Sequence, residues 1–124
     1  MLPGLRGAPM LPAKARLRRQ ADFADTIRQG RRSGRPALVV SLLTADGAHA
    51  VADPARVGFV VGRRVGGAVV RNRIRRRLRH LLADRLGLLP SGSRVVVRVL
   101  PGAERLPASD LSRELDTLLT RVVR

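Results

Sequence analysis

The sequence contains no cysteine, tryptophan or tyrosine, and phenylalanine occurs only twice. Without cysteine there can be no disulfide bridge, no zinc site built from thiolates and no cysteine nucleophile. Acidic residues are also scarce, because nine aspartates and glutamates stand against 25 lysines and arginines, which gives a formal net charge of +16. The carboxylates are scattered through expected turns and helix starts. The sequence therefore predicts no metal site held by the chain and no cofactor bound by it.

Groups suited to acid–base catalysis are equally sparse. His49, in an expected turn, and His80, in a basic segment, are the only side chains with an ordinary pKa near neutrality, and no serine–histidine–acid arrangement is evident. No apolar run approaches the roughly 20 residues that span a bilayer, and the first residues lack the hydrophobic segment of a secretory signal. We therefore expect a cytoplasmic protein with no membrane partner and no catalytic residue of its own.

What the sequence does have is length for one modest core and a large positive charge. A chain of 124 residues is one domain by size. Its charge would be self-repulsive in a compact monomer, so a nucleic-acid partner is the usual explanation and an acidic membrane surface the weaker one. Residues 1–16 combine prolines, glycines and cations without periodicity, which predicts a disordered basic arm before a single domain over residues 17–124.

The most informative stretch is residues 62–80, in which eight of nineteen residues are arginine and none is acidic. At 100° per residue, Val70, Ile74, Leu78 and Leu81 fall on one face with Leu82 beside them, which predicts an amphipathic helix with a buried apolar stripe. No acidic residue within the run stands three or four positions away to neutralise the arginines on the opposite arc, so a polyanion would relieve their repulsion. The glycines before the helix leave its N-terminal N–H groups open to a phosphate.

The other segments predict an α+β fold. A short helix is expected over residues 17–29, buried strands over 37–43 and 94–100, another strand over 56–61, and a last helix from about residue 109 to the C-terminus. Residues 31–35 are expected to form a turn, and residues 62–67 leave room for a short edge strand. The order helix, two or three strands, basic helix, strand, helix indicates a two-layer α+β sandwich.

Residues 57–76, VGFVVGRRVGGAVVRNRIRR, closely resemble the signature of the bacterial ribonuclease P protein subunit. That signature is a strand, a basic pair, a small-residue turn, and a helix that opens with Ala-Val-x-Arg-Asn-Arg-Ile. The resemblance continues more loosely from about Leu17 to the C-terminus. It implies a left-handed crossover between the strands on either side of the basic helix, where general rules favour a right-handed one.

The resemblance also implies a function and two RNA-binding surfaces on the single domain. The protein would bind the ribonuclease P catalytic RNA and the 5′ leader of precursor tRNA, while the RNA and its bound Mg²⁺ hydrolyse the phosphodiester; no obligate protein partner is evident. The basic helix and the turn before it would face the catalytic RNA, through Arg63, Arg64, Gly66, Arg71, Asn72, Arg73, Arg75, Arg76 and Arg79. A cleft between the first helix and the sheet would hold the leader, lined by Arg18, Phe23, Ile27, Val40 and Phe59.

The leader cleft departs from the family pattern. Many members carry a second aromatic residue where Ile27 stands, and aromatics often occupy the positions of Ala37 and Val40. Because each base stacked on an aromatic contributes roughly 1–3 kcal/mol, we expect leader contacts here to be more apolar and electrostatic. Two structural interpretations stay open: Phe23 as a core residue of the first helix, and Phe59 as either sheet packing or the floor of the cleft.

A different class of protein also fits the composition. Ribosomal and nucleoid structural proteins share the positive charge and the basic arm, and they too bind phosphates through basic helices. The extended match over residues 57–76 is what favours the ribonuclease P interpretation. A helix-turn-helix DNA reader fits less well, because strands flank the basic helix on both sides and no partner helix precedes it.

Overall fold

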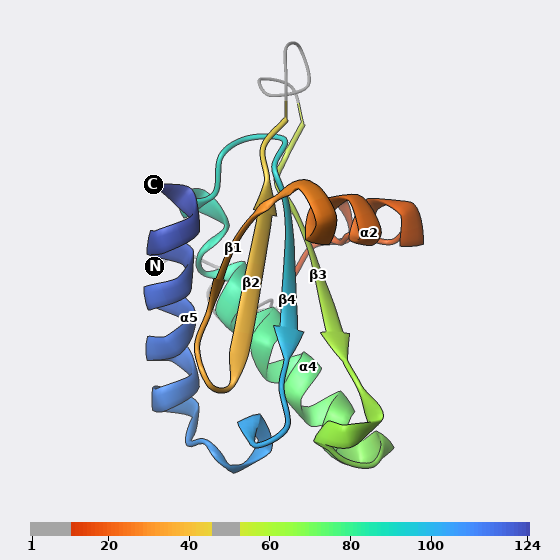
Figure 1. Cartoon of the computed structure of the whole chain (residues 1–124), viewed down its shortest axis with the longest axis vertical. Helices are drawn as coiled ribbons and strands as arrows, with labels where there is room; N and C mark the ends of the chain where they lie inside the picture. Colours follow the sequence, from red (N-terminus) through yellow and green to blue (C-terminus); the bar gives the residue numbers. More distant parts are fainter. Residues whose placement is uncertain (1–10, 46–52) are drawn as a thin grey trace, which may run out of the picture.

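The structure, a computed structural model, describes residues 11–45 and 53–124 (Figure 1). Its three α-helices are α2 (Gln20–Gln29), α4 (Ala68–Ala83) and α5 (Ala108–Val123), and its strands are β1 (Arg31–Gly34), β2 (Leu38–Leu43), β3 (Arg56–Val61) and β4 (Arg94–Val99). Four single 3₁₀ turns join them: η1 (Ala13–Ala15), η2 (Arg63–Val65), η3 (Leu86–Leu88) and η4 (Ala103–Arg105). None of the helices in these two ranges is long and apolar enough to cross a bilayer.

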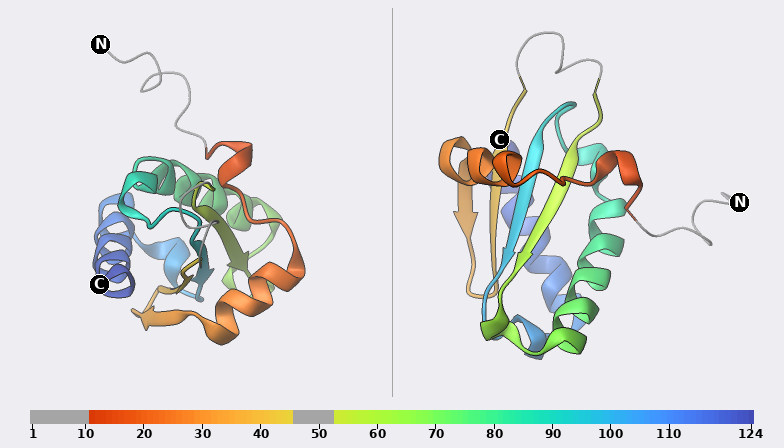
Figure 2. Two further views of the ribbon diagram at one scale, coloured as in Figure 1. Left: turned by 90° about the horizontal axis from the view of Figure 1, so that it is seen from above. Right: turned by 90° about the vertical axis from the view of Figure 1, so that its right-hand side faces the viewer.

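The four strands form one sheet in the order β1-β2-β4-β3. The pairs β1–β2 and β2–β4 are antiparallel, whereas β3 and β4 are parallel and are connected through α4. Figures 1 and 2 together show that α4 crosses between these two strands on the left-handed side. The α+β class and the left-handed crossover are confirmed.

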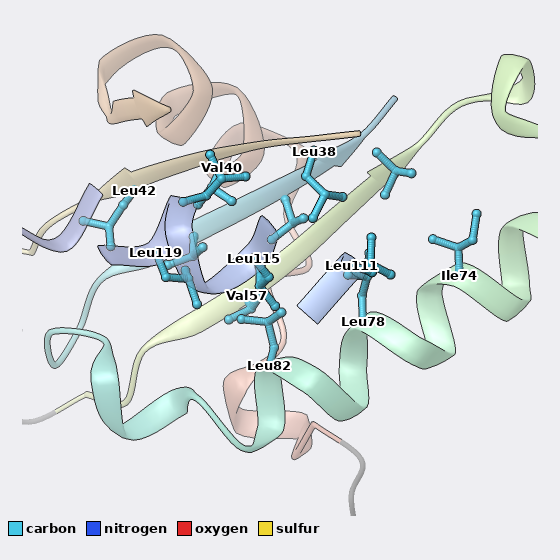
Figure 3. Packing of buried hydrophobic residues seen from close by; sticks show 14 of the residues in the cluster. Leu38, Val40, Leu42, Val57, Ile74, Leu78, Leu82, Leu111, Leu115 and Leu119 are labelled. Atoms are coloured by element: carbon cyan, nitrogen blue, oxygen red, sulfur yellow. The ribbon is translucent and has the colours of Figure 1, made fainter. Parts of the chain in front are cut away.

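Helices lie on both faces of the sheet (Figure 2). α4 and α5 cover one face, and α2 crosses the opposite face at one end. The main core fills the space between the sheet and the α4–α5 layer, where alternate residues of the strands point (Figure 3). It includes the α4 stripe that the sequence predicts, with Ile74, Leu78 and Leu82 fully buried and Val70 and Leu81 packed against them.

Two short segments differ from the sequence-based expectation. Residues 31–34, expected as a turn, form the edge strand β1, in which Arg31 pairs with Leu42 and Gly34 with Val39. Its sequence, Arg-Arg-Ser-Gly, has no alternation to reveal a strand, because its partner β2 supplies the hydrogen bonds and its side chains stay in solvent. Conversely, the segment expected to allow an edge strand turns through η2, which buries Val65.

Part of the segment that was expected to be a disordered arm packs against the domain. Residues 1–10 lie outside the described residues, but residues 11–16 are ordered, so the expected disorder of that part is wrong. Leu11 is 1% exposed and Ala15 3% exposed, and Arg16 Nε donates a hydrogen bond to the Leu11 carbonyl at 3.1 Å. Arg16 then bridges to Val57 in parallel register, and the N–H of Leu17 donates to the Val57 carbonyl at 2.9 Å. Isolated apolar residues spaced by prolines and cations gave no periodic pattern to predict this packing.

Candidate nucleic-acid interface

The turn before α4 places a basic pair beside the helix N-terminus. Gly66 ends η2 with φ of 157°, and a Cβ there would lie 2.9 Å from Val70 Cγ1, so this position requires glycine. The resulting bend leaves Arg63 and Arg64 exposed next to the first turn of α4. Val69, in that first turn, is 73% exposed. No side chain caps the N-terminus of α4, and two cations stand just before its first turn, which is an arrangement that attracts phosphate.

The outer surface of α4 carries cations without counter-charges. In the described ranges, carboxylates form ion pairs with Arg28, Arg85, Arg94, Arg105 and Arg113, none of which belongs to the arginines at positions 63–79. Within the helix, Arg75 Nη1 donates to Asn72 Oδ1 at 3.4 Å. Asn72, Arg73 and Arg76 are exposed. Five of the residues predicted to face an RNA are thus exposed on η2 and α4, namely Arg63, Arg64, Asn72, Arg73 and Arg76.

Arg75 and Arg79 differ from the exposed arginines because they are half-buried and turn toward the edge of the sheet. They line a cavity of about 130 Å³ together with Arg16, Leu17, Phe23, Val57, Gly58 and Phe59. Burial lowers the pKa of Arg79, and the charges of Arg16 and Arg75 lower it further. The cavity therefore brings together residues of both predicted surfaces, and it adds Arg16, which the sequence analysis placed in the arm.

Phe23 lies on the sheet face that α2 crosses, directly over Gly58. A Cβ built at Gly58 would be 2.3 Å from Phe23 Cζ, so the ring is in close contact with the backbone of β3. The ring is half-buried, and it also lines a second hollow with Gln20, Ala24 and Val60. Phe23 is therefore neither a residue of the main core nor a free side chain.

Of the other residues predicted to line the leader cleft, two are exposed near α2 and one is buried in the main core. Arg18 is exposed on the segment that leads into α2, and Ile27 is 40% exposed one turn after Phe23. Val40 is 0% exposed and belongs to the core between the sheet and the α4–α5 layer (Figure 3), so its assignment to the cleft is wrong. The period of two along β2 points Val40 to the face opposite α2.

Phe59 packs in the sheet, which is one of the two roles that the sequence left open. It alternates with Gly58 along β3, so its side chain points to the α4 side of the sheet, where it packs against the core. It nevertheless reaches the arginine-lined cavity at the sheet edge, because β3 is the last strand of the sheet.

Sequence reasoning missed one exposed cation on the sheet itself. Arg98 stands in the inner strand β4 and is exposed between Val39 of β2 and Val60 of β3, on the face that α2 covers only at one end. A charged residue inside an otherwise buried strand is unusual and could have indicated an open sheet face. Among the described residues, no group of three or more histidines and carboxylates gathers as a metal-binding set.

Comparison with known proteins gives a consistent family. A model of the family "Ribonuclease P" matches residues 11–123. The ribonuclease P protein component of Streptomyces bikiniensis is 56% identical over 118 residues, covering 92% of this chain and 96% of that protein. The corresponding protein of Acidothermus cellulolyticus is 50% identical over 115 residues, covering 93% of each.

Solved structures show the same fold. The ribonuclease P protein from Thermotoga maritima superposes with a TM-score of 0.73 at 27% identity, covering 86% of this chain and 96% of that one. The protein from Staphylococcus aureus gives 0.76 at 21% identity. The fold and the surface of α4 thus define an α+β protein with one strongly basic face. The chain belongs to the ribonuclease P protein family, and the alternative of a ribosomal or nucleoid structural protein is not favoured.

Proposed function

We propose that this chain is the protein subunit of ribonuclease P, which binds the catalytic RNA and assists removal of the 5′ leader from precursor tRNA. The observation that carries the proposal is the surface of α4 and η2, whose arginines have no carboxylate partner in the described part of the chain, in a member of this family. Folding such a surface concentrates like charges, and RNA phosphates would neutralise them.

The proposal assigns the two surfaces to two RNAs. The α4 and η2 surface would contact the catalytic RNA, through Arg63, Arg64, Gly66, Arg71, Asn72, Arg73, Arg75, Arg76 and Arg79. The face of β3 beside α2 would hold the leader, through Arg18, Phe23 and Ile27, with Phe59 at its edge. The exposed position of Arg98 on the same sheet face supports a leader path across the sheet.

The hydrolytic chemistry would reside in the RNA. Phosphodiester hydrolysis needs a positioned nucleophile and stabilisation of the leaving oxygen, commonly by divalent metal ions. Several carboxylates of the described residues are already engaged, since Asp22, Asp25 and Asp116 pair with arginines, as do Asp110 and Glu104. The protein would screen the repulsion between two polyanions and position the leader, and the RNA would hold the Mg²⁺.

The test is the salt dependence of binding to the cognate catalytic RNA. Each guanidinium–phosphate contact contributes roughly 0.7–0.9 to the slope of log affinity against log salt. Replacing Arg73 and Arg76 together by alanine should therefore flatten the slope by about 1–2, while circular dichroism stays unchanged because both side chains point away from the core. The matched control is Arg121→Ala, which removes an exposed arginine from α5. Equal slopes for wild type and the double variant, with the fold retained, would contradict the proposed surface.

A further inference from the structure

The cavity at the outer edge of β3 gathers three guanidinium groups from two separate parts of the chain. Arg16 comes from the N-terminal segment, and Arg75 and Arg79 come from successive turns of α4. No acidic residue is among the residues that line the cavity. The three cations therefore repel one another in the free protein, and an anion of matching size would stabilise the arrangement.

The backbone of β3 adds a hydrogen-bond donor to the same place. The Arg56 N–H donates to the Ser93 carbonyl, next to β4, whereas the Val57 carbonyl accepts from Leu17 on the outer side. Because alternate residues of a strand direct their backbone groups to the same neighbour, the Phe59 N–H also points outward. In the described residues, only the bridge at Arg16 extends the sheet beyond β3. The Phe59 N–H thus points away from β4, and its residue is one of those that line the cavity.

An aromatic ring closes one side of the cavity. Phe23 lines it through its position over Gly58, and the other side of this ring borders the hollow formed by Gln20, Ala24 and Val60. A ligand with an anionic group in the cavity would therefore place whatever is attached to that group against an apolar, aromatic surface. A nucleotide has this combination, since its phosphate is joined to a ribose and a base that stacks on aromatic rings.

We propose that this cavity binds one backbone phosphate of an RNA strand, held by Arg16, Arg75 and Arg79, next to a nucleotide that rests on Phe23. This inference depends on the proposed function and deepens it: Arg16 becomes a binding residue, and the strand passes at this point from the basic surface of α4 to the sheet face under α2. The phosphate fastens residues 11–17 to α4, because Arg16 is also tied to Leu11 and bridged to Val57.

The experiment measures the affinity of the full chain, assembled with its cognate catalytic RNA, for precursor tRNA and for mature tRNA. The variants are Arg16→Ala and Arg79→Ala, with Lys14→Ala as the matched control, because Lys14 is an exposed cation of the same N-terminal segment. Loss of one charge-assisted hydrogen bond should weaken binding about tenfold or more, and each variant should flatten the salt slope by roughly 0.7–0.9. Lys14→Ala should leave both values near those of the wild type.

The two possible sources of the phosphate give different results. If the leader supplies it, both variants weaken binding of precursor tRNA and leave mature tRNA unaffected. If the catalytic RNA supplies it, they weaken assembly of the protein with that RNA whichever tRNA is present. A precursor with a methylphosphonate at single leader positions locates the contact, because the neutral group should weaken binding by the wild type more than binding by Arg16→Ala or Arg79→Ala, each of which has already lost one of the three cations.

Unchanged affinity and salt slope for Arg79→Ala, with the fold intact by circular dichroism, would overturn the inference. Arg79→Ala is the decisive variant, because Arg16→Ala also removes the hydrogen bond to the Leu11 carbonyl and could loosen the N-terminal segment. Arg73→Ala distinguishes failure of this inference from failure of the proposed function. If only the phosphate site is wrong, Arg73→Ala still weakens binding to the catalytic RNA. If the proposed function is wrong, Arg73→Ala leaves that binding unchanged.

Discussion

Replacing Gly58 by alanine would drive a methyl group into the ring of Phe23. The added Cβ would lie 2.3 Å from Phe23 Cζ and 2.4 Å from Cε1, far inside van der Waals contact, and 3.0 Å from Leu17 Cβ. β3 is held by β4 on its other side, so the strand cannot easily retreat. The ring is half-buried at the sheet edge, and we expect it to swing outward and leave its place over β3.

Two opposing effects determine how much Gly58→Ala destabilises the fold: the added methyl group overpacks the site, and removal of a glycine from a strand is favourable. Extra methyl groups in a packed site cost roughly 1–3 kcal/mol, and a glycine within a strand is itself unfavourable by roughly 0.5–1 kcal/mol relative to alanine. We therefore expect Gly58→Ala to lower the free energy of unfolding by about 1–2 kcal/mol. In a Phe23→Ala background most of the clash disappears, so the same substitution should cost much less there.

Urea unfolding of the wild type, both single variants and the double variant measures this coupling. Circular dichroism is the suitable probe, because the chain has neither tryptophan nor tyrosine. The two substitutions should be non-additive by about 1 kcal/mol or more, as for residues in contact. Additivity within roughly 0.5 kcal/mol would refute the close packing of Phe23 on Gly58. If the contact exists, Gly58→Ala should also weaken binding of precursor tRNA in the same way as Phe23→Ala.

Three further predictions follow from the site and its surroundings. Phe23→Ala should weaken binding of precursor tRNA by the assembled enzyme, by roughly 1–3 kcal/mol for one stacked base, and leave binding of mature tRNA unchanged. Purified protein without RNA should not cleave precursor tRNA at any Mg²⁺ concentration, as judged by gel assay, and site-specific cleavage by RNA-free protein would show the contrary. Asp116 accepts a hydrogen bond from Arg85, which lowers the pKa of its carboxyl below the ordinary 3.8. The ion pair therefore stabilises the fold above about that pH and loses this contribution as the pH falls through the lowered pKa. Since half of the Asp116 side chain is exposed, Asp116→Asn should lower the free energy of unfolding by at most about 1 kcal/mol at pH 7. The difference in unfolding free energy between wild type and variant should vanish in acid unfolding experiments.

The elements that the sequence predicted well are those whose burial follows a regular period. The stripe of α4 and the apolar run of β4 could be read directly, because each residue's burial depends on how its own helix or strand faces the rest of the protein. β1 could not be read in this way, since its pairing depends on β2 rather than on its own side chains. Val40 was misplaced for a related reason: the sequence shows that a strand is buried, but not which of its two faces lies under α2.

The candidate site was predictable as a surface and not as a cavity. The missing counter-charges around Arg73 and Arg76 are visible in the sequence, because acidic residues are absent from the whole segment. The proximity of Arg16 to Arg79 is not visible in the sequence, because it depends on a single bridge between the N-terminal segment and β3 over a long sequence separation. Such contacts arise from the closed fold, and no local pattern encodes them.

The two outer edges of the sheet have a consequence for the free protein that does not involve catalysis. The edge at β1 presents the exposed side chains of Arg31 and Arg32, and the edge at β3 beyond Val57 lies beside Arg75 and Arg79. Open strand edges are templates on which a second copy can add its own strand, and natural proteins discourage this with charged side chains. Arginine at both edges therefore opposes self-association while the protein is without RNA, and at the β3 edge the arginines proposed to bind RNA also protect against aggregation.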